Sequence, residues 1–199
     1  MLHLKVPSCT LVLGSSQSGK STLVRKMIKS NLYEKKIKNI IWCYNYASPW
    51  FIEEPDFRFV QGLPEEYESG DLIVIDDFMH SLNKKIAHLF TVASHHCGVS
   101  VILILQNIFP RSPVMRDISL NAQYLILFKN SRDVNQVHTL CRQIYPQNSK
   151  FMMDSYIKAT REPYKYLFIN LHPLTKPAFR LSESLFPDAN GIHWFYAPI

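Results

Sequence analysis

The sequence feature that most constrains the fold is the segment GSSQSGKS, from Gly14 to Ser21. It has the pattern GxxxxGK[ST], in which glycine at both ends of a loop lets successive backbone amides curl around phosphate oxygens. An apolar segment, 9–13, precedes this loop, and a lysine-rich segment with helical periodicity, 21–33, follows it. Strand, glycine-bounded loop and helix is the order that phosphate binding requires, because the helix adds its positive N-terminal end. We therefore predict a phosphate-binding loop, or P-loop, at residues 14–21.

The motif also assigns roles within the loop. Lys20 is expected to neutralise the β- and γ-phosphates, and the Ser21 hydroxyl is expected to bind Mg²⁺. The nucleotide-binding residues predicted from the motif are Gly14, Ser15, Ser16, Gln17, Ser18, Gly19, Lys20, Ser21 and Thr22. The expected cofactors are ATP and Mg²⁺.

Two aspartates, Asp76 and Asp77, end the apolar segment LIVI. If this segment is a parallel strand, their carboxylates emerge at the carboxyl edge of the sheet, where such sheets bind ligands. Asp76 then fits the Walker B carboxylate, which holds Mg²⁺ through water. Asp77 is the candidate for orienting and activating the attacking water, although it is one methylene shorter than the glutamate that many DNA motors use. The alternative for Asp77 is a simple helix N-cap.

Two amides, Gln106 and Asn107, directly follow another apolar segment, 99–105. They should reach the same edge of the sheet, where Gln106 could contact the γ-phosphate and sense its loss. The alternative is a polar turn after a strand.

Apolar segments without polar alternation, separated by helical patterns, make up the rest of the chain. The predicted strands are 39–44, 57–60, 72–75, 99–105 and 124–128, and the predicted helices are 83–96, 133–145 and 149–160. A short helix is predicted with Ser112 as N-cap and Pro113 as first residue. These strands are typical of a parallel sheet covered on both faces, so the predicted fold class is three-layer α/β. Segments 165–171 and 178–181 are predicted as strands of an antiparallel edge. We expect one domain, 1–199, with a C-terminal extension from about residue 182 to 199.

Composition constrains the partners and the compartment. Lys and Arg outnumber Asp and Glu by 22 to 16, which favours a polyanionic partner but is equally compatible with a basic soluble surface. The four cysteines are isolated from one another, which indicates reduced thiols and an intracellular protein that is not secreted. His95, His96 and Cys97 are adjacent, and adjacent helix residues point in different directions, so they are not expected to share a metal ion. No apolar run is long enough for a signal peptide or a membrane span.

Taken in order, these motifs resemble the FtsK and HerA class of P-loop ATPases, and within it the packaging ATPases of double-stranded DNA viruses, including the poxvirus type, and of Polinton (Maverick) elements. The resemblance rests on GSSQSGKST, LIVIDDFM, VSVILILQNIFP, and RDISLNAQYLILFKNSRD followed by VHTLCRQIYP. It implies a RecA-like (ASCE) sheet, with the strand that ends in Gln106 inserted between the strand before the P-loop and the Walker B strand. It also implies a homo-oligomeric ring, expected to be a hexamer, with double-stranded DNA threaded through its centre.

A ring of this kind implies further site residues. Hydrolysis in oligomeric motors usually needs an arginine from the neighbouring subunit, and Arg116 and Arg132 are the candidates, with Arg111 behind them. Lys84, Lys85 and Arg111 are the choices for contacts with DNA phosphates, although the lysines could simply solubilise a helix start. A viral packaging role would add a capsid protein as partner and place the chain at virion assembly sites in the host cytoplasm or nucleus.

Two other functions compete with the motor. A P-loop kinase would transfer the γ-phosphate to a nucleotide or small molecule, but such enzymes usually carry an arginine-rich lid, and none is evident. An ATP-dependent scaffold would bind nucleotide to assemble with capsid proteins and turn it over slowly, which an aspartate at position 77 leaves open. A GTPase is disfavoured because the sequence has no NKxD motif.

Overall fold

The computed structural model describes residues 2–30, 32–78, 82–107 and 112–198. Its strands are β1 (Cys9–Leu13), β2 (Ile40–Tyr44), β3 (Phe57–Gln61), β4 (Leu72–Asp76), β5 (Ser100–Leu105), β6 (Tyr124–Phe128), β7 (Tyr166–Asn170), β8 (Leu181–Ser182) and β9 (Phe195–Tyr196). Its helices are α1 (Lys20–Lys29), α2 (Lys84–His88), α3 (Ser94–His96), α4 (Met115–Asn121), α5 (Val134–Ile144) and α6 (Ser149–Ala159). Shorter helical segments are η1 (Pro49–Glu53), the π-helical η3 (Leu89–Ala93) and η4 (Pro177–Phe179).

The strands form one sheet with the order β3-β2-β4-β5-β1-β6-β7-β8-β9. The strands from β3 to β6 in this order are parallel, so their carboxyl ends lie along one edge. Strand β5 lies between β1, which precedes the P-loop, and β4, which ends in Asp76, as the resemblance implied. The predicted antiparallel edge is also confirmed, because β7 runs antiparallel to β6 and is followed by β8 and β9.

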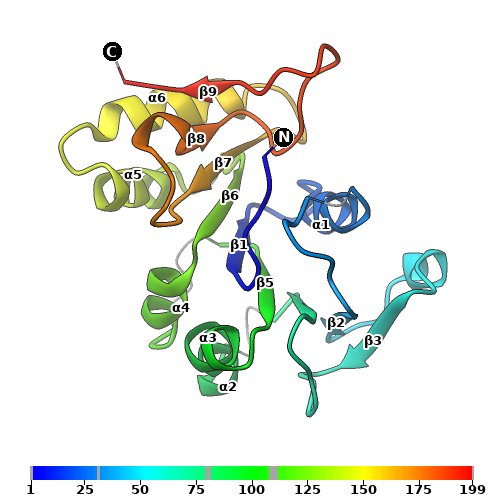
Figure 1. Ribbon diagram of the computed structural model, residues 1–199. Coiled ribbons are helices and arrows are strands. Elements are labelled where there is room, and N and C mark those ends of the chain that lie inside the picture. Colours follow the sequence, from blue (N-terminus) through cyan, green and yellow to red (C-terminus); the bar gives the residue numbers. More distant parts are fainter. Residues whose placement is uncertain (1, 31, 79–81, 108–111, 199) are drawn as a thin grey trace.

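Helices cover both faces of the sheet, as Figure 1 shows, so the predicted three-layer architecture is confirmed. Alternate residues of a strand point to opposite faces. On β1, Leu11 and Leu13 therefore pack in the layer of α2 to α6, whereas Val12 packs with α1. All five residues of β1 are buried, which explains why its sequence lacks polar alternation.

Three predicted boundaries were wrong. Helix α1 ends at Lys29 and not at residue 33, because the chain turns back to form backbone hydrogen bonds with Leu4. Helix α4 begins at Met115, with Val114 as its N-cap, and Ser112 and Pro113 belong to the preceding turn. The predicted strand 178–181 is instead the helical turn η4, followed by a strand that begins at Leu181.

The predicted helix 83–96 is one helical stretch, formed by α2, η3 and α3. Its N-cap is Asn83, whose Oδ1 accepts hydrogen bonds from the backbone N–H groups of Lys85 and Ile86. Gly98, with φ of +69°, follows its end in the left-handed conformation that suits a helix stop.

The C-terminal residues pack onto the rest of the chain. Leu185 is fully buried in the layer that contains α1, and the Lys26 ammonium of α1 lies 4.3 Å from the centre of the Phe186 ring. The rings of Phe179 and Phe195 pack edge to face, which fixes η4 against β9. Phe195 therefore contributes to packing at the β8–β9 edge.

The cysteines are free thiols in the described part of the chain, and Cys9, Cys43 and Cys141 are buried. Burial raises the pKa of Cys9 and Cys141 to about 11 and that of Cys43 to about 12, so these thiols are protonated at neutral pH. No cluster of three or more His, Cys, Asp or Glu side chains in the described ranges is placed to hold a metal ion. None of the helices in those ranges is long and apolar enough to cross a membrane.

Candidate active site

The P-loop connects the end of β1 to the start of α1. Gly14 is required by close packing, because a Cβ atom at this position would lie only 2.5 Å from Cβ of Phe128. Gln17 and Gly19 have positive φ angles, +60° and +93°, which curl the backbone into a concave loop. The first turn of α1 has no acidic residue and no side-chain cap, so its N–H groups are available to an anion.

Lys20 is the first residue of α1, and its side chain folds back over this loop. Its Nζ donates a 2.7 Å hydrogen bond to the carbonyl oxygen of Ser15. Burial lowers the pKa of Lys20, while the nearby carboxylates of Asp76 and Asp77 partly offset this effect. An anion in the loop would stabilise this buried cation.

Ser21 and Asp76 meet at the carboxyl edge of the sheet. The Ser21 hydroxyl donates a 2.9 Å hydrogen bond to Oδ2 of Asp76. Burial raises the pKa of Asp76, and the negative charge of Asp77 raises it further. The hydrogen bond from Ser21 and the positive charge of Lys20 lower this pKa but do not cancel the effect of burial. A hydroxyl beside a desolvated carboxylate provides the hard oxygen ligands that Mg²⁺ prefers, so these residues fit that ion.

Asp77 follows Asp76 and has a left-handed backbone conformation, with φ of +61°. Its side chain is exposed. Two amides from neighbouring strand ends hold it. Gln106 Nε2, after β5, donates to Oδ1 of Asp77 over 3.3 Å, and Asn45 Nδ2, after β2, donates to the Asp77 carbonyl oxygen over 2.6 Å. Asn45 is a site residue that the sequence analysis missed. It follows the predicted strand 39–44 as directly as Gln106 follows its own strand, so the same argument could have identified it.

These side chains enclose a pocket of about 160 Å³. It is lined by Ser16, Gln17, Lys20, Ser21, Asp76, Asp77, Ile104 and Gln106. Of the other predicted loop residues, Gly14, Ser15, Ser18 and Gly19 shape the loop, whereas Thr22 is exposed on α1 outside the pocket. The structure thus brings a cation, two carboxylates and an amide together around a backbone anion site.

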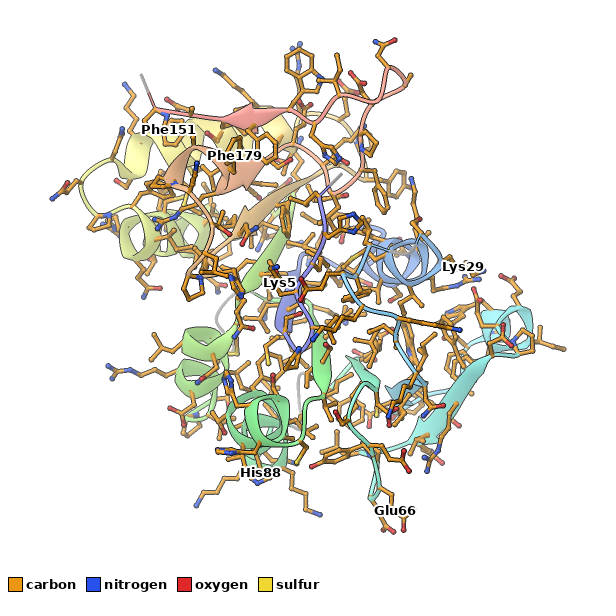
Figure 2. The ribbon with its side chains drawn as sticks, viewed as in Figure 1. Lys5, Lys29, Glu66, His88, Phe151 and Phe179 are labelled. Atoms are coloured by element: carbon orange, nitrogen blue, oxygen red, sulfur yellow. The ribbon has the colours of Figure 1, made fainter. Side chains whose placement is uncertain are left out.

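The predicted arginines lie away from this pocket. Arg116 is exposed on α4 and Arg132 is exposed in the loop before α5, and neither lines the pocket of its own chain. Arg111 lies outside the described residues. Lys84 and Lys85 are exposed on α2, where they line a groove of about 790 Å³ with His88, Tyr67 and the segment 62–65. Figure 2 shows His88 and Glu66 at this end of the molecule.

Comparisons with known proteins bear on the fold of this chain. No protein-family model matches the sequence, and no curated protein matches it. Among solved structures, it is similar to the genome packaging NTPase B204 of Sulfolobus turreted icosahedral virus 2 bound to sulfate, at a TM-score of 0.59 and 15% identity over 97% of both chains. The complex of that protein with ATPγS gives a TM-score of 0.56 and 17% identity, over 97% of this chain and 98% of the other. The DNA-packaging ATPase B204 of Sulfolobus turreted icosahedral virus gives 0.58 and 15%, with the same coverage. Over nearly its whole length, the chain has the fold of the B204 viral genome-packaging NTPases.

Proposed function

We propose that this chain hydrolyses ATP with Mg²⁺ and uses the reaction to move double-stranded DNA into a viral capsid. One observation carries the catalytic part. The Ser21 hydroxyl lies 2.9 Å from the Asp76 carboxylate, in the same pocket as Lys20, Asp77 and Gln106. These groups come from the ends of three different elements, α1, β4 and β5, and their convergence is the arrangement that phosphoryl transfer to water needs.

Each side chain has a defined task in this proposal. Lys20 and the loop amides bind the β- and γ-phosphates, and Gln106 contacts the γ-phosphate. Ser21 would hold Mg²⁺ directly and Asp76 would hold it through water, and the ion would supply positive charge to neutralise the phosphate oxygens. Asp77 orients the attacking water and accepts its proton. The contact of Gln106 with Asp77 connects the group that senses the γ-phosphate to the group that activates water.

DNA movement is the part of the proposal that rests on similarity of fold. The B204 proteins are named genome packaging NTPases, and one was studied with ATPγS. By this likeness we propose a homo-oligomeric ring, hexameric in the simplest case, with a capsid protein as a further partner and virion assembly sites in the host cell as its location. Residues 1–199 would form one ATPase domain, and the segment from about 182 onward would be an extension that packs against α1 through Phe186 and adds β9 to the edge of the sheet.

A ring would give the exposed basic residues their roles. Arg116 and Arg132 are exposed and lie outside the pocket of their own chain, so one of them would be free to reach the γ-phosphate bound by a neighbouring subunit. Lys84 and Lys85 would contact DNA phosphates, which require positive charge without base reading.

The decisive experiment is an ATPase assay with and without duplex DNA, run beside native mass spectrometry with nucleotide. If the protein is a DNA motor, we expect duplex DNA to accelerate phosphate release and ATP to induce a ring-shaped oligomer. A monomer whose rate DNA leaves unchanged would contradict the motor. Transfer of the γ-phosphate to a nucleoside or another small acceptor would favour a kinase, and nucleotide-dependent assembly with slow turnover would favour a scaffold.

To identify the arginine, inactive Lys20→Ala subunits should be mixed with subunits that carry Arg116→Ala or Arg132→Ala. In the mixture, a Lys20→Ala subunit keeps its arginine and can supply it to the intact nucleotide site of a neighbouring arginine variant. We therefore expect partial recovery of activity in the mixture for the correct arginine and none in the unmixed proteins.

A further inference from the structure

The pocket around Lys20 has room for phosphates but not for a whole nucleotide. Its volume of about 160 Å³ is below the range of roughly 300–1,000 Å³ typical of sites that enclose a small-molecule ligand. The base must therefore lie outside this pocket. The carboxylates and Gln106 occupy the β4 and β5 side of the loop. A nucleotide with its γ-phosphate there must extend toward the other side of β1, where β6 and then β7 lie.

A tyrosine lies on that side of the loop. Tyr164 precedes β7, whose first residue pairs with Phe128, the last residue of β6, at the carboxyl edge of the sheet. A Cβ atom added to Gly19 would lie 3.3 Å from Cδ1 of Tyr164 and 3.9 Å from Cε1 of Phe128. The ring therefore lies against the point where the P-loop becomes α1, yet Tyr164 is 72% exposed to solvent.

The backbone of Tyr164 gives an independent indication. Its φ is +62°, in the left-handed region that bulky residues rarely adopt. The residue lies in a tight turn, where the Lys165 N–H faces the Glu162 carbonyl oxygen at 3.4 Å, and such a turn would be easier with glycine or asparagine. The turn does not explain why an aromatic side chain is found here. Residues with strained backbone angles are found most often at active sites and ligand-binding positions.

We propose that the Tyr164 ring stacks on the base of the bound nucleotide, an inference that rests on the nucleotide binding proposed above. Stacking needs only the flat face of a base and does not read its hydrogen-bonding edge. The substrate class is therefore nucleoside triphosphates in general, with purines bound more tightly than pyrimidines because their faces are larger. Contacts with the phosphates place the γ-phosphate for catalysis, and the Tyr164 ring adds affinity for the nucleotide.

The test compares ligands with and without a base. The dissociation constants of MgATP, MgGTP, MgCTP and magnesium tripolyphosphate are measured by calorimetry for the wild-type protein and for Tyr164→Ala and Tyr164→Phe. We expect Tyr164→Ala to weaken MgATP about 10-fold, since one base–aromatic stack is of that size, and to leave tripolyphosphate unchanged. Tyr164→Phe should retain wild-type affinity for both ligands, and the wild type should bind MgATP and MgGTP almost equally and MgCTP more weakly.

Two further variants isolate the stacking effect. Tyr164→Asn removes the ring but tolerates the left-handed backbone, so it should remain folded and lose the same affinity as Tyr164→Ala. Phe179→Ala removes another exposed aromatic ring, which Figure 2 shows on η4, and should bind all ligands like the wild type.

The outcomes separate the two proposals. If Tyr164→Ala binds MgATP as tightly as the wild type, stacking is overturned while the ATPase proposal stands. If it loses ATP and tripolyphosphate equally, Tyr164 only shapes the loop at Gly19, and stacking is again overturned. If the wild type binds tripolyphosphate and MgATP equally well, the base makes no contribution and stacking fails. If the wild type binds neither ligand, the nucleotide-binding function itself fails.

Discussion

The two sides of the α1 N-terminus are built differently. On the phosphate side, Lys20 and Ser21 belong to a short motif, and Asp76 ends a strand whose four preceding residues are buried. The hydrogen bonds of these side chains are 2.7–2.9 Å long. On the other side, Phe128 and Tyr164 reach the loop from distant parts of the chain, and Tyr164 is exposed. Chemistry at a phosphorus atom needs groups held in place, whereas stacking needs only an available ring face. With the roles proposed above, this difference explains why one side has a recognisable sequence signature and the other does not.

The largest effect should come from Lys20→Ala on the phosphate side. Loss of this cation removes charge stabilisation from the transferring phosphoryl group, so we expect kcat for ATP hydrolysis to fall about 10²- to 10³-fold. Phosphate release measures this effect. Lys26→Ala, on the exposed face of the same helix, is the matched control and should keep wild-type turnover. Similar losses in both variants would show that general charge on α1, and not the position of Lys20, determines activity.

Asp77→Asn should separate chemistry from binding. The amide has nearly the same shape as the carboxylate but cannot accept a proton from water, so we expect hydrolysis to fall about 10²-fold or more. Calorimetry should find the dissociation constant for MgATP unchanged or slightly lower, because a negative charge near the γ-phosphate is removed. Wild-type turnover in Asp77→Asn would leave Asp77 as a structural residue at the end of β4.

Sequence reasoning succeeded where a local pattern fixes a side chain in space. The P-loop pattern, the two aspartates after LIVI and Gln106 after VILIL all lie at strand ends, and parallel strands bring their carboxyl ends to one edge. The same reasoning predicted the central sheet, because fully buried strands have no polar alternation to obscure them. The place of β5 between β1 and β4 was instead implied by the resemblance to the FtsK and HerA class.

Sequence reasoning failed where tertiary contacts decide. The end of α1 depends on pairing with Leu4, and the C-terminal turn at η4 depends on packing against Phe195. Tyr164 lies in a turn whose local sequence gives no sign of the neighbouring Gly19. Asn45 is different, because the strand-end rule applies to it, and its omission was an incomplete use of that rule.

Asn45→Ala tests whether backbone position matters as much as side-chain chemistry on the phosphate side. Asn45 donates to the carbonyl oxygen of Asp77, and its loss should let the left-handed Asp77 relax toward commoner backbone angles. We expect kcat to fall about 10-fold with little change in KM, since misplacement of a catalytic group by a fraction of an ångström is costly. Asn107→Ala removes an exposed amide that does not line the pocket, and it should behave like the wild type. A raised KM with unchanged kcat in Asn45→Ala would instead place Asn45 in substrate binding.

The smallest effect should be a change in stability, because burial desolvates the Asp76 carboxylate. Its pKa in the folded protein is raised, so the folded state binds more protons than the unfolded state between the ordinary aspartate pKa and the raised one. The contribution of Asp76 to stability is therefore fully present below the ordinary pKa and is lost as the pH rises through the raised pKa. Asp76→Asn keeps an acceptor for the Ser21 hydroxyl without a charge, so without nucleotide its Tm should exceed that of the wild type by a few degrees at neutral pH.

Thermal unfolding across a pH series measures this difference. The gap in Tm between Asp76→Asn and the wild type should close as the pH falls below the ordinary aspartate pKa, while Glu66→Gln, in an exposed loop, should give no such gap at any pH. Addition of MgATP should reverse the order at neutral pH, because only the wild type retains the carboxylate that we propose as the Mg²⁺ ligand. A variant that is less stable than the wild type without ligand would mean that Asp76 supports the fold rather than opposing it. In that case the phosphate side, like the packing around Gly14, would be optimised for stability and not for its ligand.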